Sequence, residues 1–162
     1  MLLADLLKLL ESAEKNPRIK SILVVVKRVA AGWAQLEEVR SAIEQIRLAG
    51  KETHIYLEQA DNKSYYLASA ADKIYLPPSA TLDFVGLSSE TLFFRNLLSY
   101  LGIEPELFNI GDYKSAAEVF QREGMSGPSR EMIDSILSDL QGRLNAEVAR
   151  NRNVSTRQVQ SW

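Results

Sequence analysis

Residues 22–26 form a run of five branched apolar side chains, Ile-Leu-Val-Val-Val. A run of this kind is typical of a strand that is covered on both faces, which is the usual environment in a parallel sheet. Two further strands are expected at residues 54–57 and 73–76, the latter closed by Pro77 and Pro78. The alternation of these strands with helical patterns predicts an α/β fold with a parallel sheet and right-handed crossover helices.

Apolar residues at helical spacing place the helices around these strands. A leucine stripe that begins at Leu2 predicts a first helix that stops at Asn16-Pro17, and Gly50 terminates the crossover helix. The remaining expectations are helices at about residues 35–49, 65–71, 92–101 and 128–150, and an extended segment at 105–110. No internal repeat or low-complexity linker interrupts this order, so we expect one domain over residues 1–162.

Composition excludes several classes of function. Nineteen Lys and Arg residues against twenty-one Asp and Glu residues leave a net charge of -2, so no broad basic surface for nucleic acid is expected. The chain has no cysteine, which excludes disulfides, thiolate metal sites and a cysteine nucleophile. Its single histidine, His54, excludes a His-rich metal cluster, and its position in an apolar strand without an obvious carboxylate partner favours a structural role. Without a phosphate-binding glycine motif, we expect no cofactor.

The most apolar opening segment, residues 1–10, contains Asp5 and Lys8. It is far shorter than the roughly 20 apolar residues that cross a membrane, and no signal-peptide pattern follows it. We expect this fragment itself to be soluble.

One lysine carries the main chemical expectation. In Gly-Asp-Tyr-Lys-Ser-Ala, residues 111–116, Lys114 follows the end of an extended segment. A lysine that is desolvated in such a place can hold a neutral amine and act as the general base for a serine hydroxyl. Taken alone, the segment fits a surface lysine in a loop better.

Residues 61–76 and 111–120 together resemble the signal peptide peptidase A (protease IV) family, and the likeness extends through Gly32-Trp33, Pro77, Gly86 and Met125-Ser126. The resemblance implies the ClpP/crotonase-like fold and a serine-lysine dyad that cleaves remnant signal peptides. It also implies oligomers associated with the cytoplasmic or thylakoid membrane through segments outside this chain.

In the long form of that family, the N-terminal half supplies the lysine and the C-terminal half supplies the serine. This chain resembles the N-terminal half, which makes Lys114 the general base. Where the catalytic half has Ser-Gly-Gly-Tyr, this chain has Asn-Lys-Ser-Tyr at residues 62–65, so Asn62 stands in the place of the serine. An amide cannot be activated to attack a peptide carbonyl. An oxyanion hole needs main-chain N–H groups close to the carbonyl, usually through adjacent glycines. The corresponding turn, residues 27–33, has a single glycine, Gly32. We therefore expect no complete active site, and the fragment alone should be inactive.

The remaining polar candidates near these motifs are expected to cap helices. Ser64 suits the first turn of a helix better than a displaced nucleophile. Ser115 is expected to cap the helix that follows it, with Glu118 completing a capping box. Asp61 and Asp72 bracket the short helix and are also assigned to capping.

The expected partners are the serine-bearing C-terminal half of the same protein, further copies in a homo-oligomer, and an apolar extended peptide that adds a strand to an exposed edge. A second hypothesis is an assembly module without chemistry, in which Lys114 is a structural cation. A third is a crotonase-type acyl-CoA enzyme, but the shortage of glycine at residues 30–32 argues against thioester chemistry.

Overall fold

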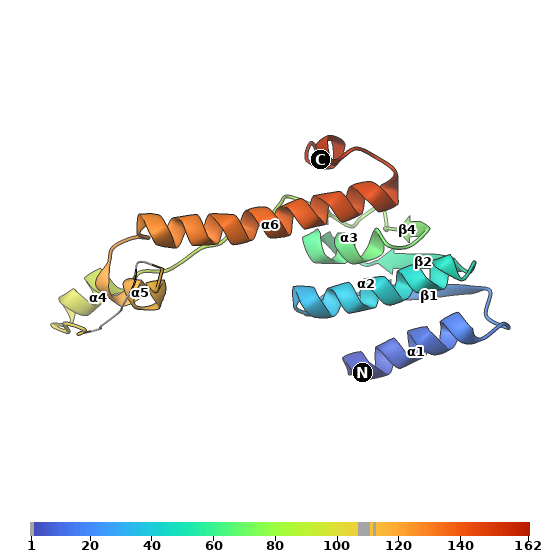
Figure 1. The fold of residues 1–162 in the computed structure, drawn as a ribbon, viewed down its shortest axis with the longest axis horizontal. Coiled ribbons are helices and arrows are strands. Elements are labelled where there is room, and N and C mark those ends of the chain that lie inside the picture. The colour runs from blue at the N-terminus through green and yellow to red at the C-terminus, as the bar shows by residue number, and fades with distance from the viewer. Residues whose placement is uncertain (1, 107–110, 112) are drawn as a thin grey trace. The chain divides into compact units, whose positions relative to one another are not determined.

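A computed structural model of the chain describes residues 2–106, 111 and 113–162 (Figure 1). It forms two compact units, residues 1–86 with 143–162 and residues 87–142. The first unit contains α1 (Leu3–Lys15), β1 (Ser21–Val26), α2 (Trp33–Leu48), β2 (Glu52–Leu57), β3 (Ala60–Asp61), α3 (Asn62–Ala68), β4 (Lys73–Tyr75), β5 (Leu82–Asp83), the end of α6 (Gly127–Arg152) and α7 (Thr156–Val159). The second contains α4 (Arg95–Tyr100), the 3-10 helix η1 (Ser115–Ala117), α5 (Glu118–Gln121) and the start of α6. The prediction of a single domain stays a prediction.

The sheet of the first unit is parallel, with strand order β1-β2-β4. Val24, Ile55 and Ile74 lie side by side in its register. The crossovers pass through α2 and α3, which confirms the expected α/β fold with a parallel sheet and crossover helices. The strands β3 and β5 form a second parallel pair, and β3 leads directly into α3.

One face of this sheet carries the core. Ile55 is fully buried and belongs to a cluster with side chains from α1, α2, α3 and the end of α6. Burial of one such aliphatic side chain contributes roughly 1.5–3 kcal/mol. The largest fully buried aliphatic members of the cluster are Leu36, Ile43, Ile46, Ile55, Leu57, Leu144, Val148 and Val159.

The opposite face of the sheet is open. Successive strand residues point to opposite faces, and in β1 the side chains of Leu23 and Val25 remain 63% and 53% exposed. Their neighbours in register on β2 are His54 and Tyr56. The expectation that both faces of β1 are covered is therefore wrong for the described residues, because none of their helices packs on this side.

The short helix α3 begins at Asn62, three residues before the expected start. The cause is a reciprocal cap. The Asp61 carboxylate accepts a hydrogen bond from the Ser64 main-chain N–H at 2.8 Å, and the Ser64 hydroxyl accepts one from the Asp61 N–H at 2.8 Å. The capping role of Asp61 and the first-turn role of Ser64 are confirmed.

Asp72 does not cap this helix, which corrects its assignment. Its Oδ2 atom accepts hydrogen bonds from the main-chain N–H and the hydroxyl of Thr53, at 2.9 and 2.8 Å. Thr53 is fully buried at the start of β2. These two donors fix the carboxylate to the sheet, and the Asp72 N–H returns a bond to the same hydroxyl at 3.0 Å.

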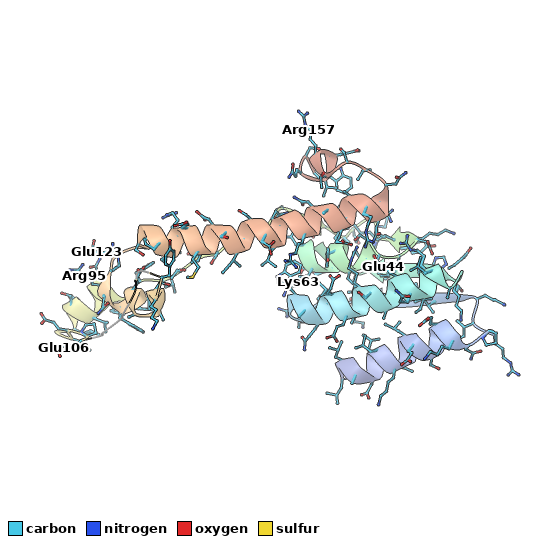
Figure 2. The ribbon with its side chains drawn as sticks, viewed as in Figure 1. Glu44, Lys63, Arg95, Glu106, Glu123 and Arg157 are labelled. Atoms are coloured by element: carbon cyan, nitrogen blue, oxygen red, sulfur yellow. The ribbon has the colours of Figure 1, made fainter. Side chains whose placement is uncertain are left out.

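A buried arginine joins three helices of the first unit. Arg40 of α2 is only 1% exposed, and its guanidinium donates to the Tyr66 carbonyl and the Ser69 hydroxyl, both at 2.8 Å. Its other nitrogen pairs with Glu44 at 3.3 Å and with Glu147 of α6 at 3.0 Å. The guanidinium carbon also lies 4.4 Å from the centre of the Tyr66 ring. Glu44, on α2, is labelled in Figure 2.

The second unit is built from short helices and the start of α6. The expected helix at 92–101 is confirmed but begins later, at Arg95. Before it, the Phe94 N–H donates to the Val119 carbonyl at 2.6 Å. The long helix is confirmed at Gly127–Arg152. The expected extended segment at 105–110 lies largely outside the described residues.

Across the described ranges, no helix combines the length and the apolar character that a bilayer crossing requires.

Candidate functional site

Lys114 lies at the start of the short helical segment of the second unit. It is exposed and is the residue immediately before η1, which continues directly into α5. Its main-chain N–H donates to the Gly111 carbonyl at 3.3 Å. The expected position of the lysine at a helix threshold is therefore confirmed.

Ser115 does not provide the expected cap. No side-chain hydrogen bond caps η1, whose N-cap residue is Lys114. The Glu118 carboxylate instead accepts from the Ser126 hydroxyl at 2.5 Å and from the Ser126 N–H at 3.1 Å. The Ser126 hydroxyl in turn accepts from the Ser129 N–H at 3.2 Å, within the first turn of α6. Glu118 prefers this partner because two donors of one residue converge on its carboxylate.

The same contact sets the electrostatics of Glu118. The Ser126 hydrogen bond is the main cause that holds the pKa of the Glu118 carboxyl below its usual value. Glu118 is 8% exposed, so its charged form depends on these donors in place of water.

Asn62, at the position expected for a nucleophile, is held by the main chain on both sides of its amide. Its Nδ2 atom donates to the Gly86 carbonyl at 2.5 Å, and its Oδ1 atom accepts from the Val85 N–H at 3.1 Å. Gly86 has a φ of 88°, a conformation that glycine adopts without strain. Asn62 therefore fastens the start of α3 to the segment that follows β5.

Lys63 connects the start of α3 to the turn that precedes α2. Its ammonium donates to the Ala31 carbonyl at 2.8 Å and lies 5.6 Å from the centre of the Trp33 ring (Figure 2). The Gly32 N–H, the candidate oxyanion donor of this turn, donates to the Gln35 side chain at 3.1 Å. The Lys63 bond thus joins the start of α3 to the turn, whereas the Gly32 bond caps α2 locally.

Ser64 is likewise committed to its own helix. It is 3% exposed, and its hydroxyl donates to the Asp61 carboxylate at 2.6 Å. The pKa of Asp61 experiences opposing effects: burial raises it, but the Ser64 hydrogen bonds outweigh burial and hold it below its usual value.

His54 has partners that sequence reasoning missed. Its Nε2 atom lies 3.2 Å from the Glu52 carboxylate and its Nδ1 atom 3.1 Å from the Tyr75 hydroxyl. The expectation that no carboxylate lies nearby is therefore wrong, because residues 52 and 54 point to the same face of β2. The two ring nitrogens thus contact a carboxylate and a phenol rather than a serine.

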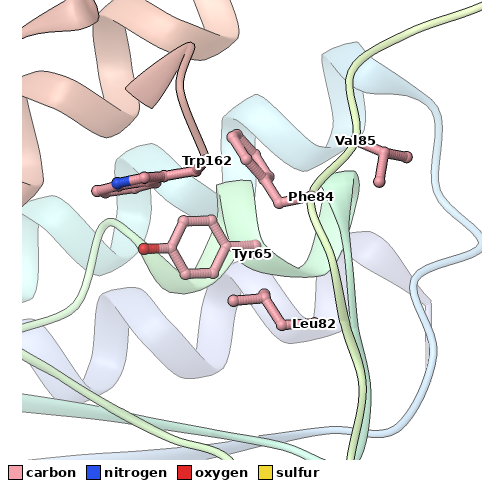
Figure 3. A pocket seen from close by; sticks show the side chains of 5 residues that line it. All are labelled: Tyr65, Leu82, Phe84, Val85 and Trp162. Atoms are coloured by element: carbon pink, nitrogen blue, oxygen red, sulfur yellow. The ribbon is translucent and has the colours of Figure 1, made fainter. Parts of the chain in front are cut away.

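An apolar pocket of about 350 Å³ opens beside α3 in the first unit (Figure 3). Its walls are Tyr65, Leu82, Phe84, Val85 and Trp162. The Tyr65 ring makes edge contacts with Phe84 and Trp162, at centroid distances of 5.1 and 6.3 Å. Burial raises the pKa of the Tyr65 phenol, partly opposed by Arg152. The residues that line the pocket come from α3 just after Asn62, from β5 and the segment after it, and from the C-terminus. The size and apolar walls of the pocket suit one apolar side chain.

In the part of the chain that the structure describes, no three His, Asp or Glu side chains are grouped to hold a metal ion.

Comparison with known proteins supplies the family. The model of peptidase family S49 matches residues 45–162, which include both Asn62 and Lys114. This chain belongs to peptidase family S49. The membership confirms the resemblance to signal peptide peptidase A and agrees with the ClpP/crotonase-like α/β fold.

Named relatives of this S49 chain are much longer. Protease 4 of Haemophilus influenzae is 33% identical over 151 residues, which cover 93% of this chain and 25% of that protein. The chloroplastic serine protease SPPA of Arabidopsis thaliana is 31% identical over 128 residues, covering 79% and 19%. A putative protease of Methanocaldococcus jannaschii is 23% identical over 150 residues, covering 92% and 47%. The chain thus spans a quarter or less of the first two relatives.

Some contacts of the S49 chain were missed by sequence reasoning. Lys63 contacts the turn before α2 across 32 positions, and Glu118 contacts Ser126 across eight. Phe84 and Trp162 come together only through the packing around Tyr65. No local pattern in the sequence signals contacts of this kind.

Proposed function

We propose that this chain is the lysine-supplying part of a serine-lysine signal peptide peptidase. In this proposal the neutral Lys114 amine takes the proton of a serine hydroxyl as its oxygen attacks the scissile carbonyl. The protonated amine then delivers that proton to the leaving amide nitrogen. The serine and the oxyanion donors come from the C-terminal half of the same protein, so this chain alone is inactive.

The observation that carries the proposal is the state of Asn62. The residue at the nucleophile position has an amide that cannot be activated, and both ends of that amide are bonded to the main chain of Val85 and Gly86. Lys114, which the resemblance assigns to the lysine motif, by contrast lies at an exposed helix start. This combination supports a division of labour between two parts of one protein.

The substrate in this proposal is an apolar peptide, the chemical class of a remnant signal peptide. The pocket around Tyr65 supports it, because an apolar pocket beside a short strand suits one side chain of an extended peptide. A homo-oligomer, and association with a membrane through segments outside this chain, belong to the same proposal.

Replacement of Lys114 in the full-length protein tests the proposal. Lys114→Ala should lower kcat for an apolar peptide by at least about 100-fold, the lower range for loss of a general base. Lys114→Arg should be equally inactive, because a guanidinium stays protonated at working pH. The matched control is Lys8→Ala, which removes an exposed lysine of α1 and should leave kcat unchanged.

The second candidate function is an assembly module without chemistry. The open face around Leu23 and Val25 favours it, since an apolar sheet face of this kind is usually covered. If Lys114→Ala leaves kcat unchanged while Leu23→Asp prevents assembly, this second function replaces the first.

A further inference from the structure

The segment that carries Lys114 is too short to hold its own shape. The 3-10 helix η1 has three residues and α5 has four, and isolated helices of this length are not stable in water. The position of Lys114, which directly precedes η1, therefore depends on contacts that this segment makes with its surroundings.

Glu118 supplies a charged and buried contact of this kind. It is the first residue of α5, and its carboxylate accepts both the hydroxyl and the N–H of Ser126. Hydrogen bonds to a carboxylate are about twice as strong as neutral ones. Ser126 is itself fixed because its hydroxyl accepts from the Ser129 N–H at the start of the 26-residue helix α6. Glu118 thus connects the η1-α5 segment, which Lys114 directly precedes, to the longest helix among the described residues.

Other contacts act on the same segment. On the other side of the lysine, the Tyr113 hydroxyl donates to the Glu131 carboxylate of α6 at 3.2 Å. Beyond Glu118, the Val119 carbonyl accepts the Phe94 N–H, and the Phe94 and Phe120 rings stack with centroids 6.1 Å apart. The Tyr113 contact is exposed, so solvent competes with it, whereas the Glu118 carboxylate is buried.

We propose that Glu118 is a positioning residue, which fixes the Lys114 amine at the reacting serine by holding the η1-α5 segment against the start of α6. This inference rests on the proposed function of Lys114 as a general base. It assigns a role in catalysis to a carboxylate that does not itself touch the substrate. A displacement of about 1 Å in a catalytic group can cost about 100-fold in rate, so loss of the tether acts on kcat rather than on peptide binding.

Four single variants of the full-length protein separate geometry from charge. Glu118→Ala removes the tether and should lower kcat about 10- to 100-fold, with KM within about 2-fold. Glu118→Gln keeps the side-chain length and one acceptor oxygen, so it should recover most of the activity. Glu118→Asp keeps the charge but shortens the reach, so it should behave like Glu118→Ala. The matched control, Glu123→Ala, removes an exposed carboxylate of the following loop (Figure 2) and should leave kcat unchanged.

A measurement on the chain alone provides a readout independent of peptide cleavage. In Glu118→Ala, amide hydrogen exchange of residues 115–121 should accelerate, while that of β2 stays as in the unchanged chain. Acceleration in both regions would mean general unfolding and would overturn the positioning role. If Glu118→Ala does not fold, the comparison of Glu118→Gln with Glu118→Asp decides the matter by itself.

The outcomes distinguish this inference from the function on which it rests. If Lys114→Ala keeps full activity, the proposed function fails. If Lys114→Ala is inactive but Glu118→Ala keeps the kcat of the unchanged protein, only the positioning role is overturned. Activity in Glu118→Asp together with loss in Glu118→Gln would overturn it as well, because the negative charge rather than the reach would then matter.

Discussion

The side-chain amide of Asn62 donates to the main-chain carbonyl of Gly86, with the two atoms 2.5 Å apart. The other end of the same amide accepts the N–H of Val85. An asparagine is suited to this place because it offers one donor and one acceptor on a single planar group. Asn62, which the resemblance places where a catalytic half would carry its nucleophile, thus connects α3 with the segment after β5.

Asn62→Ser should therefore destabilise the chain without creating a protease. A serine cannot span both main-chain groups, and the loss of these hydrogen bonds should cost about 1–2 kcal/mol in the free energy of unfolding. The variant should also stay unlabelled by a fluorophosphonate. Urea unfolding and mass spectrometry measure the two outcomes, with Asn96→Ser, an exposed change in α4, as the control. Labelling of residue 62 would contradict the structural role of Asn62.

Arg40→Ala should be among the most destabilising single changes. It removes the hydrogen bonds to Tyr66 and Ser69 and one ion-pair partner of Glu44 and Glu147, which keep Arg150 as a second partner. A buried polar group left without its hydrogen-bond partner costs about 1–3 kcal/mol. Chemical denaturation followed by circular dichroism measures the loss. Arg28→Ala, at an exposed position of the β1-α2 turn, should cost less than about 0.5 kcal/mol. Equal effects of the two changes would show that the Arg40 cluster does not stabilise the fold.

The contact between Glu118 and Ser126 should weaken in acid. The pKa of Glu118 lies below its ordinary value of 4.5, chiefly because Ser126 donates to the charged carboxylate. The folded chain therefore binds this proton less readily than the unfolded chain does. The stabilisation is complete above pH 4.5 and is lost as the pH falls through the lowered pKa.

Comparison with Glu118→Gln isolates this effect from that of Asp61, whose pKa is also lowered. Urea midpoints of the two proteins should differ at about pH 7, and the difference should shrink as the pH falls below 4.5. A difference that stays constant over this range, or grows in acid, would show that the Glu118 charge does not contribute as described.

Because one face of the sheet is open, we expect β1 to tolerate substitutions on that face. Leu23→Thr keeps a side chain suited to strands and should change the free energy of unfolding of this chain by less than about 0.5 kcal/mol. Ile55→Ala, on the covered face of the neighbouring strand, should cost about 2–5 kcal/mol. Equilibrium unfolding of both variants provides the test. A cost above about 1.5 kcal/mol for Leu23→Thr would mean that this side chain is covered after all.

The elements that sequence alone predicted are those with strong local patterns. The branched run at residues 22–26 and the apolar repeat at 35–49 became β1 and α2, because strand and helix periodicity suffice to define them. The Asp61 and Ser64 cap was predictable for the same reason, since both partners lie within one turn.

The features that sequence missed depend on contacts between distant segments. The pairing of β3 with β5 joins two-residue strands that carry no periodic signal. Arg40 reaches Glu147 across 107 positions, and Lys63 reaches the Ala31 carbonyl across 32. The coverage of β1 was overestimated because a continuous apolar run does not show which of its faces the neighbouring helices cover.

The central claim is that the proton acceptor lies in this chain and the attacking hydroxyl lies outside it. The most direct test maps the site that a fluorophosphonate labels in the full-length protein, with and without Lys114→Ala. We predict that the label lies on a serine outside residues 1–162 and disappears when Lys114 is replaced. A label on Ser64 or on any other serine of this chain, or undiminished labelling in Lys114→Ala, would contradict the claim.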